Sequence, residues 1–312
     1  MTTRGRSLAA TALLAAVAAL TLTSMTVTEA MAQSQAWQQI KNNNHIIDRQ
    51  KTGGGSPGDA GEVTIDFFGH AAFRVTSPSG LTMLFDPWRN DPSGAWGLWF
   101  PNPFPQVEVD TVMSTHAHFD HDAIERPQAQ MILDRMTGVY EFGDVRVTGL
   151  ADKHQCEAPG WYAWTNAMPE FGQPQCPPDN YHHLDNNIYV IETGGLRIAI
   201  WGDNRQNPAD HIWPQLNDLD VLILPVDSSQ HILSYKQASD IVERLSPRIV
   251  IPEHYLTKGV SITLTTLGTA EEWTKGNASH TVLDGPTLKL TPDEAKKYSE
   301  HVMYFAEHHL KE

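Results

Sequence analysis

The chain of 312 residues has few cysteines and few basic side chains. Its two cysteines, Cys156 and Cys176, lie far from the N-terminus, so no cysteine there could carry a lipid. Lysine and arginine number 22 against 37 aspartate and glutamate residues, a net charge of −15. A protein that acts on nucleic acid would benefit from a basic groove, so the composition argues against a nucleic-acid substrate or partner.

The N-terminus has the pattern of a secretory signal peptide. Arg4 and Arg6 precede an apolar core from Leu8 to Leu22, and Ala30-Met31-Ala32 has small residues at the spacing of a cleavage site. The apolar core is short for a membrane span, although an uncleaved anchor is the alternative. We therefore expect a signal peptide over residues 1–32 and a periplasmic or secreted mature protein. No stable membrane insertion is expected after the signal is removed.

The rest of the chain predicts one domain. Residues 33–61 are polar and rich in Asn and Gly, which predicts a flexible lead-in to a domain over residues 62–312. Alternating apolar residues predict strands near 63–67 and 81–85. Helical spacing predicts a helix over 232–245, and residues 291–310 predict a capped, polar C-terminal helix. Mixed strands and helices indicate an α/β fold of two sheets sandwiched between helices.

The most informative motif runs from Thr115 to Asp122. It has four metal-capable side chains within six residues, in the pattern HxHxDH: His116, His118, Asp120 and His121. In an extended segment His116 and His118 point the same way, whereas Asp120 and His121 follow one turn later and could face a second ion. Imidazole and carboxylate ligands suit Zn²⁺ or a neighbouring first-row metal. The motif therefore predicts a metal site with room for two ions rather than a polar loop.

Three further strand-like segments each end in a candidate ligand. His154 follows the apolar run at 145–150, Asp203 follows the run at 196–201, and His254 follows the run at 248–251. Loops at the ends of buried strands can bring distant residues to one point. Each residue alone would be weak evidence, but together they complete a seven-residue set.

In this order of residues the chain resembles the metallo-β-lactamase superfamily, in which HxHxDH is followed by a His, an Asp and a His, each after a strand. The segments 68–73, 84–87 and 251–255 are similar to a branch of Zn-dependent hydrolases that includes ascorbate-6-phosphate lactonase-like and N-acyl-phosphatidylethanolamine phospholipase D-like proteins. The resemblance covers residues 61–290. It implies a four-layer αββα sandwich.

The resemblance also implies a ligand set and a mechanism. Two divalent ions are expected, with zinc favoured and manganese or iron left open. A hydroxide between the ions would be the nucleophile, and Asp120 and Asp203 are the expected catalytic carboxylates. The implied ligands are His116, His118 and His154 for the first ion and Asp120, His121 and His254 for the second, with Asp203 bridging both.

Departures from the best-known members of that family bear on the substrate. Carbapenem-hydrolysing members generally lack the bridging Asp, and one class uses a Cys ligand, whereas this chain has Asp203 and no Cys directly after a strand. β-Lactam hydrolysis is therefore disfavoured. In an exported protein Cys156 and Cys176 are expected to form a disulfide. The alternative is that Cys156, two residues after His154, provides a metal thiolate.

Several other residues are weaker candidates. Asp86 could orient a ligand imidazole or could only form a turn before Pro87. His70 could be a structural hydrogen bonder or a site residue. Aromatic residues near 88–104 and at Trp161 and Trp164 could form an apolar pocket or only pack the loops together. Candidates for substrate contact are Arg89, Arg205, His231 and Tyr255. Histidines expected to lie on the surface or in solvent are His182, His183, His301, His308 and His309.

The sequence thus predicts an exported, binuclear metal-dependent hydrolase that cleaves an ester, lactone, amide or phosphodiester bond of a small molecule. Two alternatives stay open. An iron-dependent redox enzyme could use similar ligands, and a non-catalytic metal-binding protein would keep the metal without turnover. The oligomeric state is also open, because the length suits a monomer or a symmetric dimer.

Overall fold

The computed structural model describes residues 55–94, 97–155, 184–258, 260, 265–306 and 308. The chain divides into a unit of residues 1–48 and a unit of residues 49–312, and the described fold belongs to the second. The predicted signal peptide, most of the lead-in and both cysteines lie outside the described residues. The predicted cleavage and disulfide therefore stay predictions.

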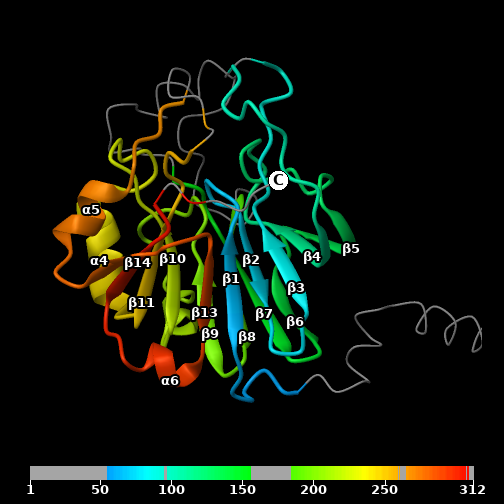
Figure 1. The fold of residues 1–312 in the computed structure, drawn as a ribbon, viewed down its shortest axis with the longest axis vertical. Coiled ribbons are helices and arrows are strands. Elements are labelled where there is room, and N and C mark those ends of the chain that lie inside the picture. Colours follow the sequence, from blue (N-terminus) through cyan, green and yellow to red (C-terminus); the bar gives the residue numbers. More distant parts are fainter. Residues whose placement is uncertain are drawn as a thin grey trace, which may run out of the picture. The chain divides into compact units, whose positions relative to one another are not determined.

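The first sheet has six strands in the order β13-β1-β2-β3-β4-β5 (Figure 1). Neighbours from β13 to β3 are antiparallel, and β3, β4 and β5 are parallel. The predicted strands at 63–67 and 81–85 are confirmed, and β2 was not foreseen. The strands are β1 (Val63–Phe67), β2 (Phe73–Thr76), β3 (Thr82–Phe85), β4 (Glu108–Ser114), β5 (Gln128–Asp134) and β13 (Thr287–Leu290).

The second sheet has eight strands in the order β12-β14-β11-β10-β9-β8-β7-β6. Strands β6 to β9 form an antiparallel meander, and β9, β10, β11, β14 and β12 run parallel. Parallel β9, β10 and β11 end at the same edge, where Asp203 and His254 follow β9 and β11. The strands are β6 (Gly138–Phe142), β7 (Val145–Asp152), β8 (Asn186–Thr193), β9 (Leu196–Ile200), β10 (Val221–Pro225), β11 (Ile249–Glu253), β12 (His280–Val282) and β14 (His301–Tyr304).

The two sheets share one apolar core. The ring of Phe85 in β3 lies 5.6 Å from the ring of Tyr189 in β8, and the ring of Phe67 in β1 lies 5.2 Å from that of Phe305 after β14. All four side chains are buried. The Tyr189 hydroxyl donates to the Ser114 carbonyl at the end of β4 (3.0 Å) and accepts from the Met136 N–H (2.9 Å). Packing and these hydrogen bonds together fix one sheet against the other.

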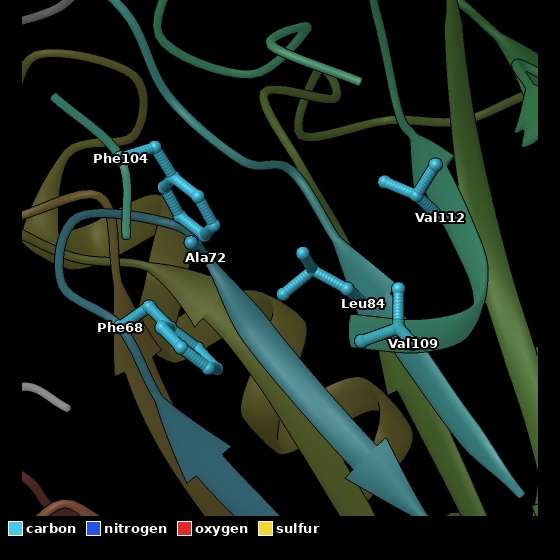
Figure 2. Packing of buried hydrophobic residues seen from close by; sticks show 6 residues of the cluster. All are labelled: Phe68, Ala72, Leu84, Phe104, Val109 and Val112. Atoms are coloured by element: carbon cyan, nitrogen blue, oxygen red, sulfur yellow. The ribbon is translucent and has the colours of Figure 1, made fainter. Parts of the chain in front are cut away.

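A loop covers part of the first sheet. Phe104, in the loop between β3 and β4, packs with Phe68, Ala72 and Leu84 in a buried cluster that also contains Val109 and Val112. Figure 2 shows the Phe104 ring directed toward Ala72, close to Phe68. The loop thus closes the sheet surface next to the strand ends that carry the metal-capable residues.

The described helices all follow β9 in sequence. They are η3 (Trp213–Leu216), α4 (Tyr235–Leu245), α5 (Glu271–Gly276) and α6 (Pro292–Ala295). Helix α4 begins at a capping box formed by Ser234 and Gln237, and it buries four residues at helical spacing: Ala238, Ile241, Val242 and Leu245. The predicted α/β fold with two sheets and the helix near 232–245 are therefore confirmed. In the described part of the chain no helix is long and apolar enough to cross a bilayer.

The predicted C-terminal helix is wrong beyond its first turn. Thr291 and Glu294 do form the predicted capping box, but α6 ends at Ala295. Glu300 has a left-handed backbone (φ 50°), which ends helical geometry, and residues 301–304 become the buried strand β14 between β11 and β12. His301 is consequently buried between Ser279 and Thr281 rather than exposed on a polar helix.

We expect Tyr189→Phe to lower the free energy of unfolding by about 2 kcal/mol, because the Met136 N–H loses its acceptor and the buried Ser114 carbonyl loses one of its two donors. Tyr140→Phe in β6 is the matched control, since its hydroxyl donates to the Thr137 carbonyl at an exposed site. The control should change stability by less than about 0.5 kcal/mol. Urea unfolding followed by circular dichroism measures both. Equal effects would show that the Tyr189 hydroxyl does not couple the sheets.

Candidate metal centre

The HxHxDH motif begins directly after β4. Ser114 is the last residue of that strand, and the chain then turns back at once, with the His121 N–H donating to the His118 carbonyl (3.0 Å). The His116 backbone forms an isolated bridge with Asn186 at the start of β8. The motif is therefore held between the two sheets, at the edge where β7, β9 and β11 also end.

The other three predicted ligands reach the same place. His154 lies two residues after β7, Asp203 three residues after β9 and His254 directly after β11. The strand-end argument from the sequence is thus confirmed in geometry for all three. The buried strands before them fix the positions of these side chains.

The metal-capable side chains form two clusters. One contains His116, His118, His154 and Asp203, and the other contains His70, Asp120, His121 and His254, with the ligand atoms of each cluster within 4.8 Å of one another. The second cluster is completely buried, whereas His118 in the first is exposed. Either cluster has the donor set of a zinc or related first-row metal site.

Asp203 contacts both clusters. Its Oδ2 lies 3.3 Å from Nε2 of His154 and 3.2 Å from Nε2 of His254, and its Oδ1 lies 3.5 Å from Nε2 of His121. His116 is close as well, with Nε2 3.7 Å from Oδ2. One carboxylate is therefore within reach of ligands on both sides.

Buried atoms without partners show that these residues fit a cation. Among the described residues, Nε2 of His116, His121 and His254 and Oδ1 of Asp203 are buried and make no hydrogen bond. Leaving such polar atoms unsatisfied is costly, and a divalent ion placed among them would coordinate them.

The electrostatics suit metal ligation. Burial lowers the pKa of His116 well below its usual range, which leaves a neutral imidazole with a free lone pair. Burial alone would raise the pKa of Asp203, but His254 and His121 outweigh it and hold the pKa well below its usual range. Burial lowers the pKa of His121, but Asp203, Asp120 and Asp86 together raise it to about 9. The same carboxylates would stabilise a divalent cation.

Asp86 orients one of these imidazoles, as one of its two interpretations predicted. Its Oδ2 lies 2.8 Å from Nδ1 of His121, and the backbone N–H and hydroxyl of Thr115 donate to its two oxygens (both 2.7 Å). Nδ1 of His121 is thereby engaged, so Nε2 faces Asp203. Asp86 is fully buried and has a left-handed backbone (φ 48°). Its position therefore serves the motif as well as the turn before Pro87.

His70 belongs to the second cluster. Its Nε2 lies 3.1 Å from Oδ2 of Asp120, and its ring centroid lies 4.4 Å from that of His254. Its carbonyl accepts from the His254 N–H (3.0 Å). The sequence left its role open because His70 sits in a turn, at φ 59°, and not at a strand end. The Gly69-His70 turn was the available signal.

Glu253 is a site residue that the sequence analysis missed. It is fully buried at the end of β11, and its Oε1 accepts from the Gly202 N–H (3.1 Å), beside Asp203. Burial and the charge of Asp86 raise its pKa to about 8. Gly202 has φ 57°, and a Cβ there would lie 2.7 Å from the Thr115 hydroxyl. An acidic residue inside an otherwise apolar strand was the signal for Glu253.

The candidates for substrate contact lie in different surroundings. Arg89 pairs with Asp122 (2.9 Å) and Arg205 makes a two-pronged pair with buried Asp152 (3.0 and 2.6 Å), so internal carboxylates hold both guanidinium groups. Tyr255 is wrong as a substrate contact, because its side chain is buried in the core against Phe67 and Tyr304. His231 is near the site: its ring stacks at 5.5 Å on that of His254.

The aromatic loop packs against itself and against the HxHxDH motif. Trp88 stacks on Phe100 with ring centroids 4.4 Å apart, and Trp99 meets Phe119 edge-on at 5.3 Å. These contacts favour the packing interpretation for this loop. The other aromatic candidates, Trp96, Trp161 and Trp164, lie outside the described residues, as do Cys156, Cys176, His182, His183 and His309.

Comparison with known families identifies the fold and the family. Residues 64–254, more than half of the chain, match the family described as the beta-lactamase superfamily domain. The chain belongs to the β-lactamase superfamily. The match ends at His254, so it includes every metal-capable residue of both clusters.

Relatives of this superfamily member are named metal-dependent hydrolases. One from Rubrobacter xylanophilus is 26% identical over 220 residues, covering 63% of this chain and 83% of the relative. Another from Thermococcus onnurineus is 26% identical over 215 residues, covering 62% and 85%. A Thermotoga maritima structure, named as a candidate Zn-dependent hydrolase of the metallo-β-lactamase superfamily, has TM-score 0.53 and 21% identity, covering 78% of this chain and 98% of its own. The predicted superfamily, sandwich fold and metal-dependent hydrolase class are confirmed.

We expect Asp86→Asn to weaken the binding of a divalent ion, tested with added zinc as the probe, about 10- to 100-fold, because the amide cannot hold His121 and Thr115 as the carboxylate does. Competition titration with a zinc chelator measures the affinity. Asp110→Asn is the control, since Asp110 receives the N–H and hydroxyl of Thr82 at the far end of the same strands. Unchanged zinc affinity in Asp86→Asn would remove Asp86 from the metal centre.

Proposed function

We propose that this superfamily member is a binuclear metal-dependent hydrolase, with Asp203 shared between two divalent ions, zinc being favoured. His116, His118 and His154 would hold one ion, and Asp120, His121 and His254 the other. The observation that carries the proposal is the contact of one Asp203 carboxylate with histidines of both clusters. Two close cations repel each other, and an anion between them offsets that repulsion.

Each residue of the proposed site has a separate role. Bound divalent ions would lower the pKa of water toward neutrality and polarise the oxygen of the scissile bond. Asp203 keeps its negative charge between the clusters, and Asp86 fixes the His121 ring. Asp120 fixes the His70 ring in the second cluster through a hydrogen bond. No serine or cysteine nucleophile is required.

The substrate approaches from the side of the first cluster. His118 is exposed and His154 is half-buried, whereas all four residues of the second cluster are buried. Small esters, lactones, amides and phosphodiesters are the proposed substrates. The acidic composition argues against nucleic acid as a substrate.

Elemental analysis of the purified protein should find roughly two metal ions per chain, with hydrolysis that is lost on adding a chelator. Asp203→Asn should lose metal and turnover together. Asp122→Asn is the control, since Asp122 follows the motif directly but pairs with Arg89. A panel of chromogenic ester, lactone, phosphodiester and β-lactam substrates would identify the bond class.

Other results would overturn the proposal. An Asp203→Asn protein that turns over like the wild type would exclude the shared carboxylate. Iron with a visible absorption band and no hydrolysis would move the assignment to redox chemistry. Retained metal with no turnover of any substrate would favour a non-catalytic metal-binding protein.

We propose export as well, supported by the Arg4-Arg6 and Ala30-Met31-Ala32 pattern. Expression of the full chain in a bacterial host should yield a periplasmic protein whose intact mass corresponds to a start at Gln33. A cytoplasmic product that retains residues 1–32 would contradict this.

A further inference from the structure

A pocket of about 350 Å³ opens beside the first cluster. Its lining includes His116, His118 and His154, three of the proposed ligands. The described lining residues also include Arg135 and Asn187. Neither residue belongs to the two metal-capable clusters.

The turn that carries Arg135 is fixed to the metal motif. It joins β5 to β6, and the Arg135 N–H donates to the carbonyl of Ser114, the residue before Thr115-His116 (3.2 Å). The next N–H, of Met136, donates to the Tyr189 hydroxyl, which itself donates to Ser114. On the other side a Cβ at Gly149 would lie 1.7 Å from the Met136 carbonyl oxygen, so the turn packs directly on the β7 backbone. Arg135 is therefore held at a set place relative to His116.

The Arg135 backbone is unusual for its residue type. Its φ of 49° lies in the left-handed region that favours glycine. A non-glycine residue held in this way is a reason to look for function. The large cationic side chain at this position is the feature that a glycine would not supply.

The guanidinium group of Arg135 can still donate a hydrogen bond to a ligand. Its Nε and Nη2 donate to the two carboxylate oxygens of Asp134 (3.0 and 2.8 Å), which fixes the orientation of the group. Nη1 makes no hydrogen bond to any described residue. The side chain is 44% exposed, so a ligand can reach it.

Asn187 adds a second donor to the same pocket. Its backbone N–H donates to the Thr115 carbonyl (2.9 Å), which fixes the residue beside the motif. Its side chain is buried, and Nδ2 has no hydrogen-bond partner in the described part of the chain. The acidic lining residue, Asp185, already accepts from the His154 N–H (2.8 Å). Arg135 and Asn187 thus each bring an uncommitted donor to the pocket, and the buried Oδ1 of Asn186 is an uncommitted acceptor in the same lining.

We propose that this pocket binds an anionic group of the substrate, a carboxylate or a phosphate, at a point separate from the scissile bond. Arg135 supplies the positive charge and Asn187 a neutral donor, while the histidine wall places the reacting bond at the metal centre. The inference rests on the proposed function, because it needs a substrate held at that centre. It narrows the substrate class to small acidic molecules.

Equilibrium binding tests the pocket without requiring turnover. We would titrate the purified protein with adipate and with its neutral diamide, using calorimetry on the wild type, Arg135→Gln and Arg146→Gln. Arg146 is the matched control, because it is an exposed arginine paired with Glu141 and Glu192 away from the pocket. Adipate should bind more tightly than the diamide, and Arg135→Gln should weaken adipate about 10- to 100-fold, as expected for charge-assisted hydrogen bonds. Arg146→Gln should bind like the wild type.

A kinetic measurement extends the test to the active site. For the 4-nitrophenyl monoester of adipic acid and 4-nitrophenyl hexanoate, which share the scissile bond, Arg135→Gln should raise KM for the acidic ester alone. Circular dichroism and a thermal melt would confirm that the variants fold. Equal affinity of wild type and Arg135→Gln for adipate, or equal affinity for adipate and diamide, would overturn the inference. Selective adipate binding with no hydrolysis would instead contradict the proposed function and leave the anion pocket standing.

Discussion

The site depends on one buried carboxylate placed between two groups of imidazoles. Asp203 is 2% exposed, and its oxygens lie within 3.2–3.7 Å of nitrogens from four histidines. A charge so deeply buried is stable only with compensating partners. The backbone around it is correspondingly fixed: its carbonyl accepts from Gln155 N–H at 2.7 Å, and the Gly202 N–H before it is held by Glu253. Changes to this turn would therefore alter both clusters at once.

A second layer of acidic residues, Asp86 and Glu253, supports that arrangement. Asp86 lies against His121 and accepts two hydrogen bonds from Thr115. Glu253 ends β11 in the second sheet, and burial and the charge of Asp86 raise its pKa to about 8. At neutral pH it is largely uncharged, so it can bind the Gly202 N–H without adding another full negative charge. The supporting layer thus positions the ligands while limiting repulsion among the carboxylates.

The sequence predicted the features that depend on local order and missed those that depend on distant partners. His154, Asp203 and His254 could be found because each follows an apolar strand, and the strand pattern is local. His70 could not be assigned, because its place opposite Asp120 depends on a left-handed turn and on packing across fifty residues. Arg205 is only a candidate substrate contact from the sequence, because its actual partner, Asp152, lies on another strand and cannot be found from local order. In the same way, residues 301–304 form a strand that pairs with β11 on one side and β12 on the other, and the helical pattern in the sequence could not reveal these partners.

The distribution of ligands over the two sheets links metal binding to folding. In the first cluster, His116 and His118 follow a strand of the first sheet, while His154 and Asp203 follow strands of the second sheet. The second cluster is divided in the same way, with His70, Asp120 and His121 from the first sheet and His254 from the second sheet. An ion in either cluster would therefore connect the sheets at this edge, in addition to the apolar core between them. Since the unfolded chain does not hold these ligands together, the free energy of metal binding would add to the stability of the sandwich. The same geometry that brings the ligands together thus requires both sheets to be packed before either cluster is complete.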